Sequence, residues 1–146
     1  MATWLTVLRR YVPFVGAANL MWEAAHLPLY TLWREGTFRE QAFAVVHCAG
    51  GDLLIAAASL LLALLLAGDA RWPDDRRVYR RVAALAVAFG VLYTIFSEWL
   101  NVVVRQSWAY SELMPVVPLL DAGLSPLMQW IVVPVAGFWL AGRRAR

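Results

Sequence analysis

The sequence predicts an all-α integral membrane protein, an up-and-down bundle of four transmembrane helices. First, 62% of the 146 residues are hydrophobic and only 16% are charged, more apolar surface than a soluble core of this size encloses. Second, the charge-poor runs are long enough to cross about 30 Å of hydrocarbon as helices. Third, short connections make neighbouring helices antiparallel. The spans cover residues 11–33, 42–67, 82–104 and 124–142, and residues 1–146 form a single transmembrane domain.

The first span follows Arg9 and Arg10, an arrangement also seen in signal peptides. Glu23 would interrupt the apolar region of such a peptide, so we expect an uncleaved first helix. Pro28 lacks an amide hydrogen, and we expect it to kink this helix beside His26.

The other spans have recognisable starts. Thr37 and Glu40 have the spacing of a capping box ahead of the second span. Residues 73–75, Pro-Asp-Asp, suit the start of the third helix. Ser125 before Pro126 predicts a capping hydroxyl followed by a proline in the first turn of the fourth helix.

The connection over residues 107–124 is unusually apolar for a loop. Pro115 and Pro118 argue against a continuous helix there, and Trp108 and Tyr110 are typical of a membrane interface. Two interpretations stay open: a lid over the outer mouth of the bundle, or a loop lying on the lipid surface.

Arginine distribution predicts the orientation. All 13 basic residues are arginine, and an N-terminus inside the cell leaves only Arg34, Arg39 and Arg105 outside. Both termini are therefore expected in the cytoplasm, with the chain integral to the cytoplasmic (inner) membrane. The net charge of +3 is explained by these orientation signals, so no nucleic-acid partner is expected. The lone Cys48 excludes a disulfide within one chain.

Polar side chains gather in the outer half of the predicted spans, within about 15 Å of the outer boundary. The cytoplasmic halves hold almost none, so no polar path through the membrane is evident. The outer groups are Glu23 and His26 in the first span, His47 and Asp52 in the second, Glu98 and Asn101 in the third, and Gln129 in the fourth.

Burying these groups is expensive. An ionised carboxylate at mid-membrane costs about 2.5–3.5 kcal/mol, so Glu23, Asp52 and Glu98 would together cost about 8–10 kcal/mol if unpartnered. That rivals the whole stability of an ordinary domain, about 5–15 kcal/mol. The carboxyl groups must therefore be partnered, protonated or neutralised by a cation.

Helical spacing places several of these groups on common faces. One stripe runs along the first span through Asn19, Glu23, His26 and Tyr30, and another along the third through Thr94, Glu98, Asn101 and Arg105. On the second span His47 and Asp52 lie about 140° apart. Gly50–Gly51 between them predicts either a bend that turns both inward or a close helix contact.

The first functional interpretation is a metal site. Two imidazoles and three carboxylates suit one divalent transition metal, whether Zn, Fe, Mn or Cu. Glu-x-x-His resembles half of the ligand pattern of di-iron carboxylate bundles, but the second half is missing. The predicted ligands are Glu23, His26, His47, Asp52 and Glu98, with Asn101 and Gln129 orienting them and Trp22 in the pocket wall.

Three alternatives remain. The first is a metal-free isomerase or hydratase for a lipidic or apolar substrate, with Glu23 and Glu98 as catalytic acids and a histidine as base. The second is a structural or assembly subunit held by pairs such as Glu98–Arg105 and Glu23–His47. The third is a haem b site between His26 and His47, which the neighbouring carboxylates disfavour. The lipid bilayer is the expected partner, and oligomerisation stays open.

Overall fold

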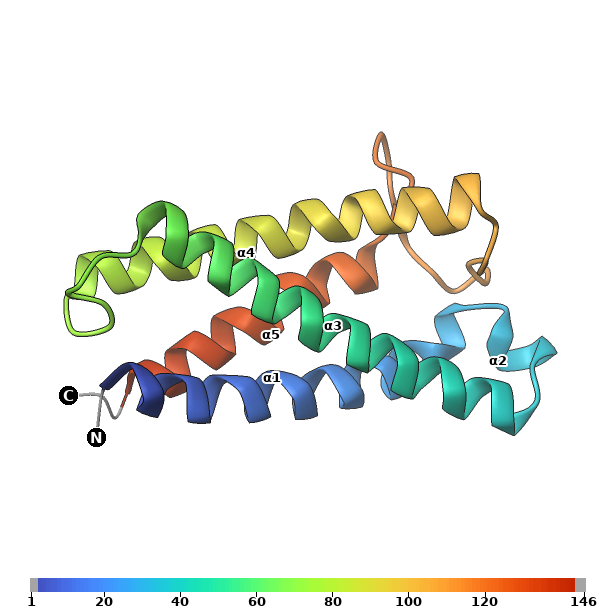
Figure 1. Cartoon of the computed structure of the whole chain (residues 1–146). Helices are drawn as coiled ribbons and strands as arrows, with labels where there is room; N and C mark the ends of the chain where they lie inside the picture. Colours follow the sequence, from blue (N-terminus) through green and yellow to red (C-terminus); the bar gives the residue numbers. More distant parts are fainter. Residues whose placement is uncertain (1–2, 144–146) are drawn as a thin grey trace.

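A computed structural model describes residues 3–143 of the chain. Over this range four long helices form the bundle, and two neighbours flank each of them (Figure 1). They are α1 (Thr3–His26), α3 (Phe38–Ala67), α4 (Arg76–Glu98), which continues as the π-helix η2 (Trp99–Val104), and α5 (Leu124–Gly142). The short elements are η1 (Leu27–Leu29), α2 (Leu32–Glu35), and the antiparallel strands β1 (Val116–Val117) and β2 (Ala122–Gly123).

The helices run up and down. The start of α1, the α3–α4 connection and the end of α5 lie at one end of the bundle, and α2 lies at the other (Figure 1). Helix α3 packs between α1 and α4, and α5 packs against the other side of both. The predicted helical bundle is therefore confirmed.

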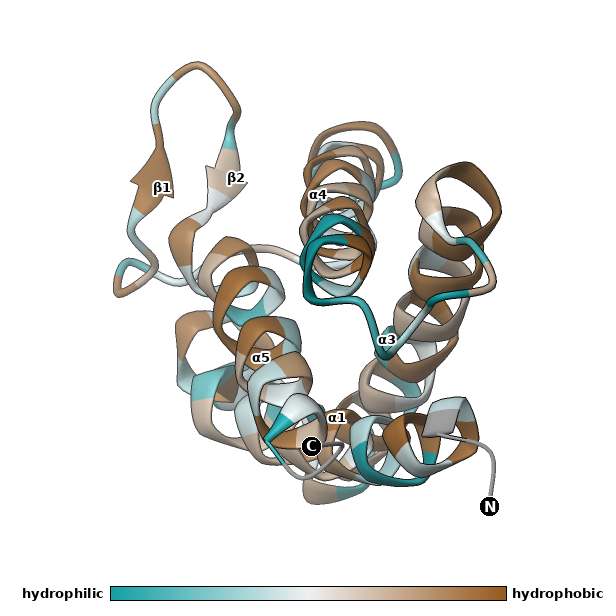
Figure 2. Cartoon of the chain, turned by 90° about the vertical axis from the view of Figure 1, so that its left-hand side faces the viewer, coloured by the Kyte–Doolittle hydropathy of each residue, from teal (hydrophilic) through white to brown (hydrophobic). Residues whose placement is uncertain are grey.

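Within residues 3–143, three helices are long and apolar enough to cross a membrane: α3, α4 together with η2, and α5. Helix α1, which contains Arg9, Arg10 and Glu23, is not among them. Apolar side chains such as Leu54 and Leu65 stay about three-quarters exposed on α3, as expected of a surface that faces lipid. Hydrophilic residues gather in the α3–α4 connection (Figure 2).

Two predicted helix starts are confirmed. The Thr37 hydroxyl accepts from the amide of Glu40, whose carboxylate accepts from the amide of Thr37, a complete capping box. The Asp75 carboxylate accepts from the amides of Arg77 and Val78 and caps α4. Because these caps precede the apolar runs, α3 and α4 begin four and six residues earlier than predicted.

Two other boundary predictions were wrong. Helix α1 ends at His26 instead of kinking there, because Pro28 cannot continue the hydrogen-bond ladder, and Tyr30 lies beyond the helix. The residue at the cap position of α5 is Gly123. Ser125 is already inside the helix, and its hydroxyl bonds to another helix instead of the backbone.

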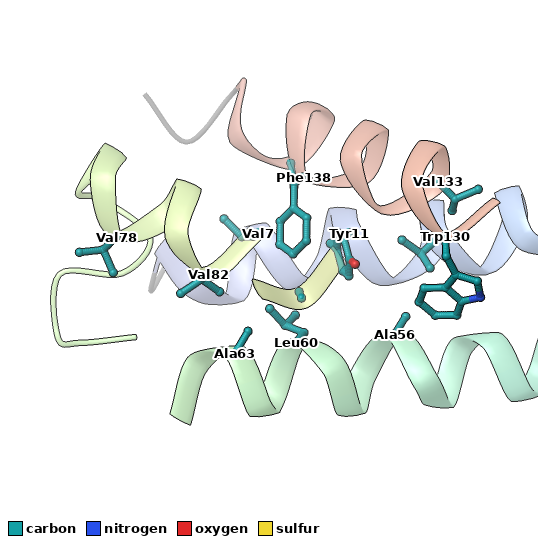
Figure 3. Packing of buried hydrophobic residues seen from close by; sticks show 13 residues of the cluster. Val7, Tyr11, Ala56, Leu60, Ala63, Val78, Val82, Trp130, Val133 and Phe138 are labelled. Atoms are coloured by element: carbon teal, nitrogen blue, oxygen red, sulfur yellow. The ribbon is translucent and has the colours of Figure 1, made fainter. Parts of the chain in front are cut away.

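The apolar core occupies the half of the bundle nearest the α3–α4 connection. Side chains from all four long helices meet there, and the rings of Tyr11 and Phe138 lie 4.4 Å apart (Figure 3). Nearer the α2 end, Trp130 packs against α4 at Gly90, where a Cβ atom would lie only 2.2 Å from the indole. Beyond Trp130 the interior becomes polar.

Candidate functional site

A polar cavity of about 250 Å³ lies between α1, α3, α4 and α5, in the half of the bundle nearer α2. It brings together all five side chains that the sequence marked as metal ligands, and the five come from three different helices. They are Glu23, His26, His47, Asp52 and Glu98. Gln129 and Trp130 of α5 complete the wall.

Gln129 connects three helices at the floor of this cavity. Its side-chain nitrogen lies 3.0 Å from Asn19 Oδ1, 3.0 Å from Glu23 Oε1 and 2.9 Å from Asp52 Oδ2. The amide of Gln129 thus joins the Glu23 and Asp52 carboxyl groups of two different helices.

His26 extends the network away from Glu23. Its Nε2 lies 3.1 Å from Glu23 Oε2, and its Nδ1 lies 3.0 Å from the hydroxyl of Ser125. Ser125 also accepts a hydrogen bond from the indole of Trp22 at 3.1 Å, and an indole only donates. With the serine proton pointing at Nδ1, the ring proton lies on Nε2 and faces Glu23.

These bonds form a continuous row of three side chains, Glu23, His26 and Ser125, and Gln129 joins Asp52 to its end. His26 is only 7% exposed and lines both the polar cavity and a second, apolar groove on the outside of α1 and α5. The row therefore joins two separate spaces, and each of its members can pass or accept a proton.

Glu98 is held on the opposite side of the cavity. The Tyr110 hydroxyl donates to its carboxylate and accepts from the amide of Gly123 at 2.8 Å. Burial, and after it the bond to Glu98, raises the pKa of Tyr110 above its usual range. Tyr110 therefore stays protonated and serves as a donor.

The connection between η2 and α5 divides into two parts. Backbone bonds from Thr31 to Ala109 and from Ser111 to Leu29 attach its first part to the chain after α1, and Trp108 lines the cavity. The second part is the β1–β2 hairpin, whose Leu119 is fully exposed.

Several predicted residues take other positions. His47 is exposed at the rim of the cavity and stacks on Phe43, with ring centroids 5.3 Å apart. Asn101 donates to the Ser97 carbonyl at 2.9 Å and is not part of the cavity wall. Trp22 lines the apolar groove instead of the cavity.

The role expected of Gly50–Gly51 also changes. Helix α3 runs unbroken through both glycines, and a Cβ atom on either would meet nothing within 4 Å. A close helix contact therefore does not explain them. Gly51 lines the cavity, where the missing side chain leaves open space.

The described part of the chain offers little for a metal ion. Among residues 3–143, no group of three or more His, Cys, Asp or Glu side chains is placed to hold one. Both ring nitrogens of His26 are hydrogen-bonded to protein groups, which leaves neither free for a metal or a haem iron. The predicted metal site thus gains no support from the geometry.

No protein-family model, no curated protein and no solved structure matches this chain. Its function must therefore be argued from the cavity and the hydrogen-bonded row.

Proposed function

We propose that the chain is a membrane-embedded acid–base enzyme that acts on a lipidic or apolar molecule. The observation that carries this proposal is the row from Glu23 through His26 to Ser125, bonded at each step and bordered by a cavity. A structural network needs bonded polar groups, but it needs no open space beside them.

The catalytic groups are Glu23 and His26, with Glu98 facing them. Glu23 lies within hydrogen-bond distance of His26 and accepts from Gln129, so a proton added at one end of the row can leave at the other. Glu98, fixed by Tyr110, supplies a second carboxyl group across the cavity. Two carboxyl groups in different surroundings suit separate acid and base roles.

In this proposal α1 is the fourth transmembrane helix, and both termini lie in the cytoplasm. The arginine bias of the sequence supports this orientation, because ten of the 13 arginines belong to the segments that it assigns to the cytoplasmic side. The cavity then opens toward the outer face of the inner membrane, and residues 107–111 form its lid.

Cysteine accessibility tests the orientation. In a Cys48→Ser background, Glu112→Cys is expected to react with a membrane-impermeant maleimide on intact cells. Asp74→Cys is expected to react only after permeabilisation. The opposite pattern would refute the proposed orientation.

Isotope labelling tests the acid–base function without a known substrate. The purified protein is incorporated into vesicles of total host lipid extract, in water enriched in deuterium and heavy oxygen, and the lipids are analysed by mass spectrometry. We expect a lipid species that gains label with the wild type and with Glu35→Gln, an exposed control. Glu23→Gln and His26→Gln should lower its formation by about a hundredfold or more. If these variants only lower the melting temperature and no species gains label, the network is structural.

A metal ion bound in the cavity is the second candidate: the wall contains five potential ligand side chains, although among residues 3–143 no group of three or more is placed to hold a metal ion. Elemental analysis of detergent-purified protein tests it. Near-stoichiometric metal that is lost in His26→Ala and His47→Ala would support this candidate, whereas metal-free folded protein leaves the acid–base proposal.

A further inference from the structure

We infer that Ser125 is the nucleophile of an ester-cleaving reaction on an acyl lipid, with His26 as its base. The inference rests on the proposed function, because it uses the same Glu23–His26 pair, and it adds the substrate class and the bond that breaks. Two independent observations carry it: the order of the hydrogen bonds and the apolar groove beside the serine.

The hydrogen bonds supply the three roles that an activated serine needs. The serine hydroxyl lies 3.0 Å from a ring nitrogen of His26 that is free to accept its proton, and the other ring nitrogen lies 3.1 Å from Glu23. Nucleophile, base and orienting carboxylate thus stand in series. The Trp22 indole donates to the hydroxyl oxygen at 3.1 Å, so the serine hydrogen remains available for His26.

The groove supplies a place for the substrate. Its volume is about 700 Å³, and it is lined by apolar side chains of α1 and α5, with His26 and Ser125 in its wall. Along α1 it extends from Phe14 to beyond His26, about 18 Å at the helical rise. An acyl chain from the outer leaflet fits a groove that is apolar toward the bilayer centre and polar toward the surface, and its ester group would then lie beside Ser125.

The reaction balances with water as the second reactant. The Ser125 oxygen attacks the ester carbonyl carbon, and its proton moves to Nδ1 of His26. The bond to the alcohol oxygen breaks, and that oxygen leaves with the proton from His26. Water then attacks the acyl-serine, again losing its proton to His26, and releases a fatty acid while the serine regains its hydrogen. Glu23 holds the ring and stabilises its positive charge in both halves.

A fluorophosphonate with a long alkyl chain tests this inference on the full-length protein in vesicles. We expect one label per chain, mapped by tandem mass spectrometry to Ser125 in the wild type, so the result does not depend on whether a variant folds. His26→Gln should slow labelling by about a hundredfold or more, and Ser125→Ala should abolish it. Ser59→Ala, at a serine of α3 that lines neither the cavity nor the groove, is the control and should leave labelling unchanged.

The assignment of Ser125 as the nucleophile would be refuted by labelling at another residue, by no labelling, or by an unchanged labelling rate in His26→Gln. The labelled-water experiment separates this failure from failure of the proposed function. Heavy oxygen in a released fatty acid supports ester cleavage. Deuterium on a lipid carbon without labelling of Ser125 supports the acid–base function and refutes the serine nucleophile. If no lipid gains isotope and Ser125 is not labelled, both proposals are refuted.

Discussion

The side-chain nitrogen of Gln129 on α5 lies 3.0 Å from Oε1 of Glu23 on α1 and 2.9 Å from Oδ2 of Asp52 on α3. One amide, only 2% exposed, therefore ties three helices together at a single level of the bundle. Its two hydrogens face three acceptors, counting Asn19. The packing of α5 therefore depends on how this one amide is shared among acceptors of α1 and α3.

Replacing Gln129 with Met should destabilise the protein while nearly preserving volume. The change removes the donor from Asn19, Glu23 and Asp52, and each buried polar group left unpaired costs about 1–3 kcal/mol. We expect the free energy of unfolding in mixed micelles to fall by at least that amount. The half-exposed neighbour Met128, changed to Leu, is the control and should stay within about 0.5 kcal/mol of the wild type. Equal stability of the two variants would contradict this account of Gln129.

Replacing Tyr110 with Phe should loosen the connection between η2 and α5. The phenol is the partner of both Glu98 and the Gly123 amide, so its loss frees a buried carboxylate and the start of α5. We expect faster amide hydrogen exchange over residues 107–123, with α3 unchanged. Tyr93→Phe on the exposed side of α4 is the matched control. Unchanged exchange in Tyr110→Phe would show that the backbone bonds alone hold this segment.

The sequence was sufficient to predict where a helix starts when its capping signal is local. The Thr37–Glu40 capping box and Asp75 act over three residues, so they can be read from spacing alone, and both are confirmed. Ser125 carried the same kind of signal and was misinterpreted, because a hydroxyl in the first turn can bond to the backbone or to another helix. Only the position of His26 in space decides between them.

The sequence predicted the level of the site residues along the helices but not their hydrogen-bond partners. Counting residues along each span grouped the five ionisable side chains correctly, since the helical rise is constant. The partners were not predictable: Glu98 bonds to Tyr110 instead of Arg105, and Glu23 to His26 instead of His47. These pairings depend on helix rotation and on the path of residues 105–123, which periodicity does not encode.

Two glycines provide a matched pair of stability predictions. A Cβ atom at Gly90 would lie 2.2 Å from Trp130, whose ring is 4% exposed and cannot move away, so Gly90→Ala should lower stability by about 1–3 kcal/mol. At Gly50 a Cβ atom meets nothing within 4 Å, and alanine is the better helix former by about 0.5–1 kcal/mol. We therefore expect the melting temperature to fall in the first variant and to rise in the second. A fall in both would show that α3 needs flexibility at Gly50.

Acidification should weaken the start of α4 through Asp75. Its carboxylate accepts from the amides of Val78 and Arg77, at 3.1 and 2.7 Å, and these bonds hold its pKa below the usual range. Because the pKa is lower in the folded state than in the unfolded chain, where it is about 3.9, the contribution is complete above that value. It is lost as the pH falls through the folded pKa.

The variant Asp75→Asn isolates this effect, because asparagine caps a helix about as well as aspartate but does not titrate. Other carboxyl groups titrate in both proteins, so the informative quantity is the difference in melting temperature between them. We expect the wild type to be more stable at neutral pH, since its anion also favours the helix N-terminus. The advantage should shrink below about pH 4 and vanish once Asp75 is protonated. A difference that stays constant from neutral to acid pH would mean that the charge of Asp75 contributes nothing to the cap.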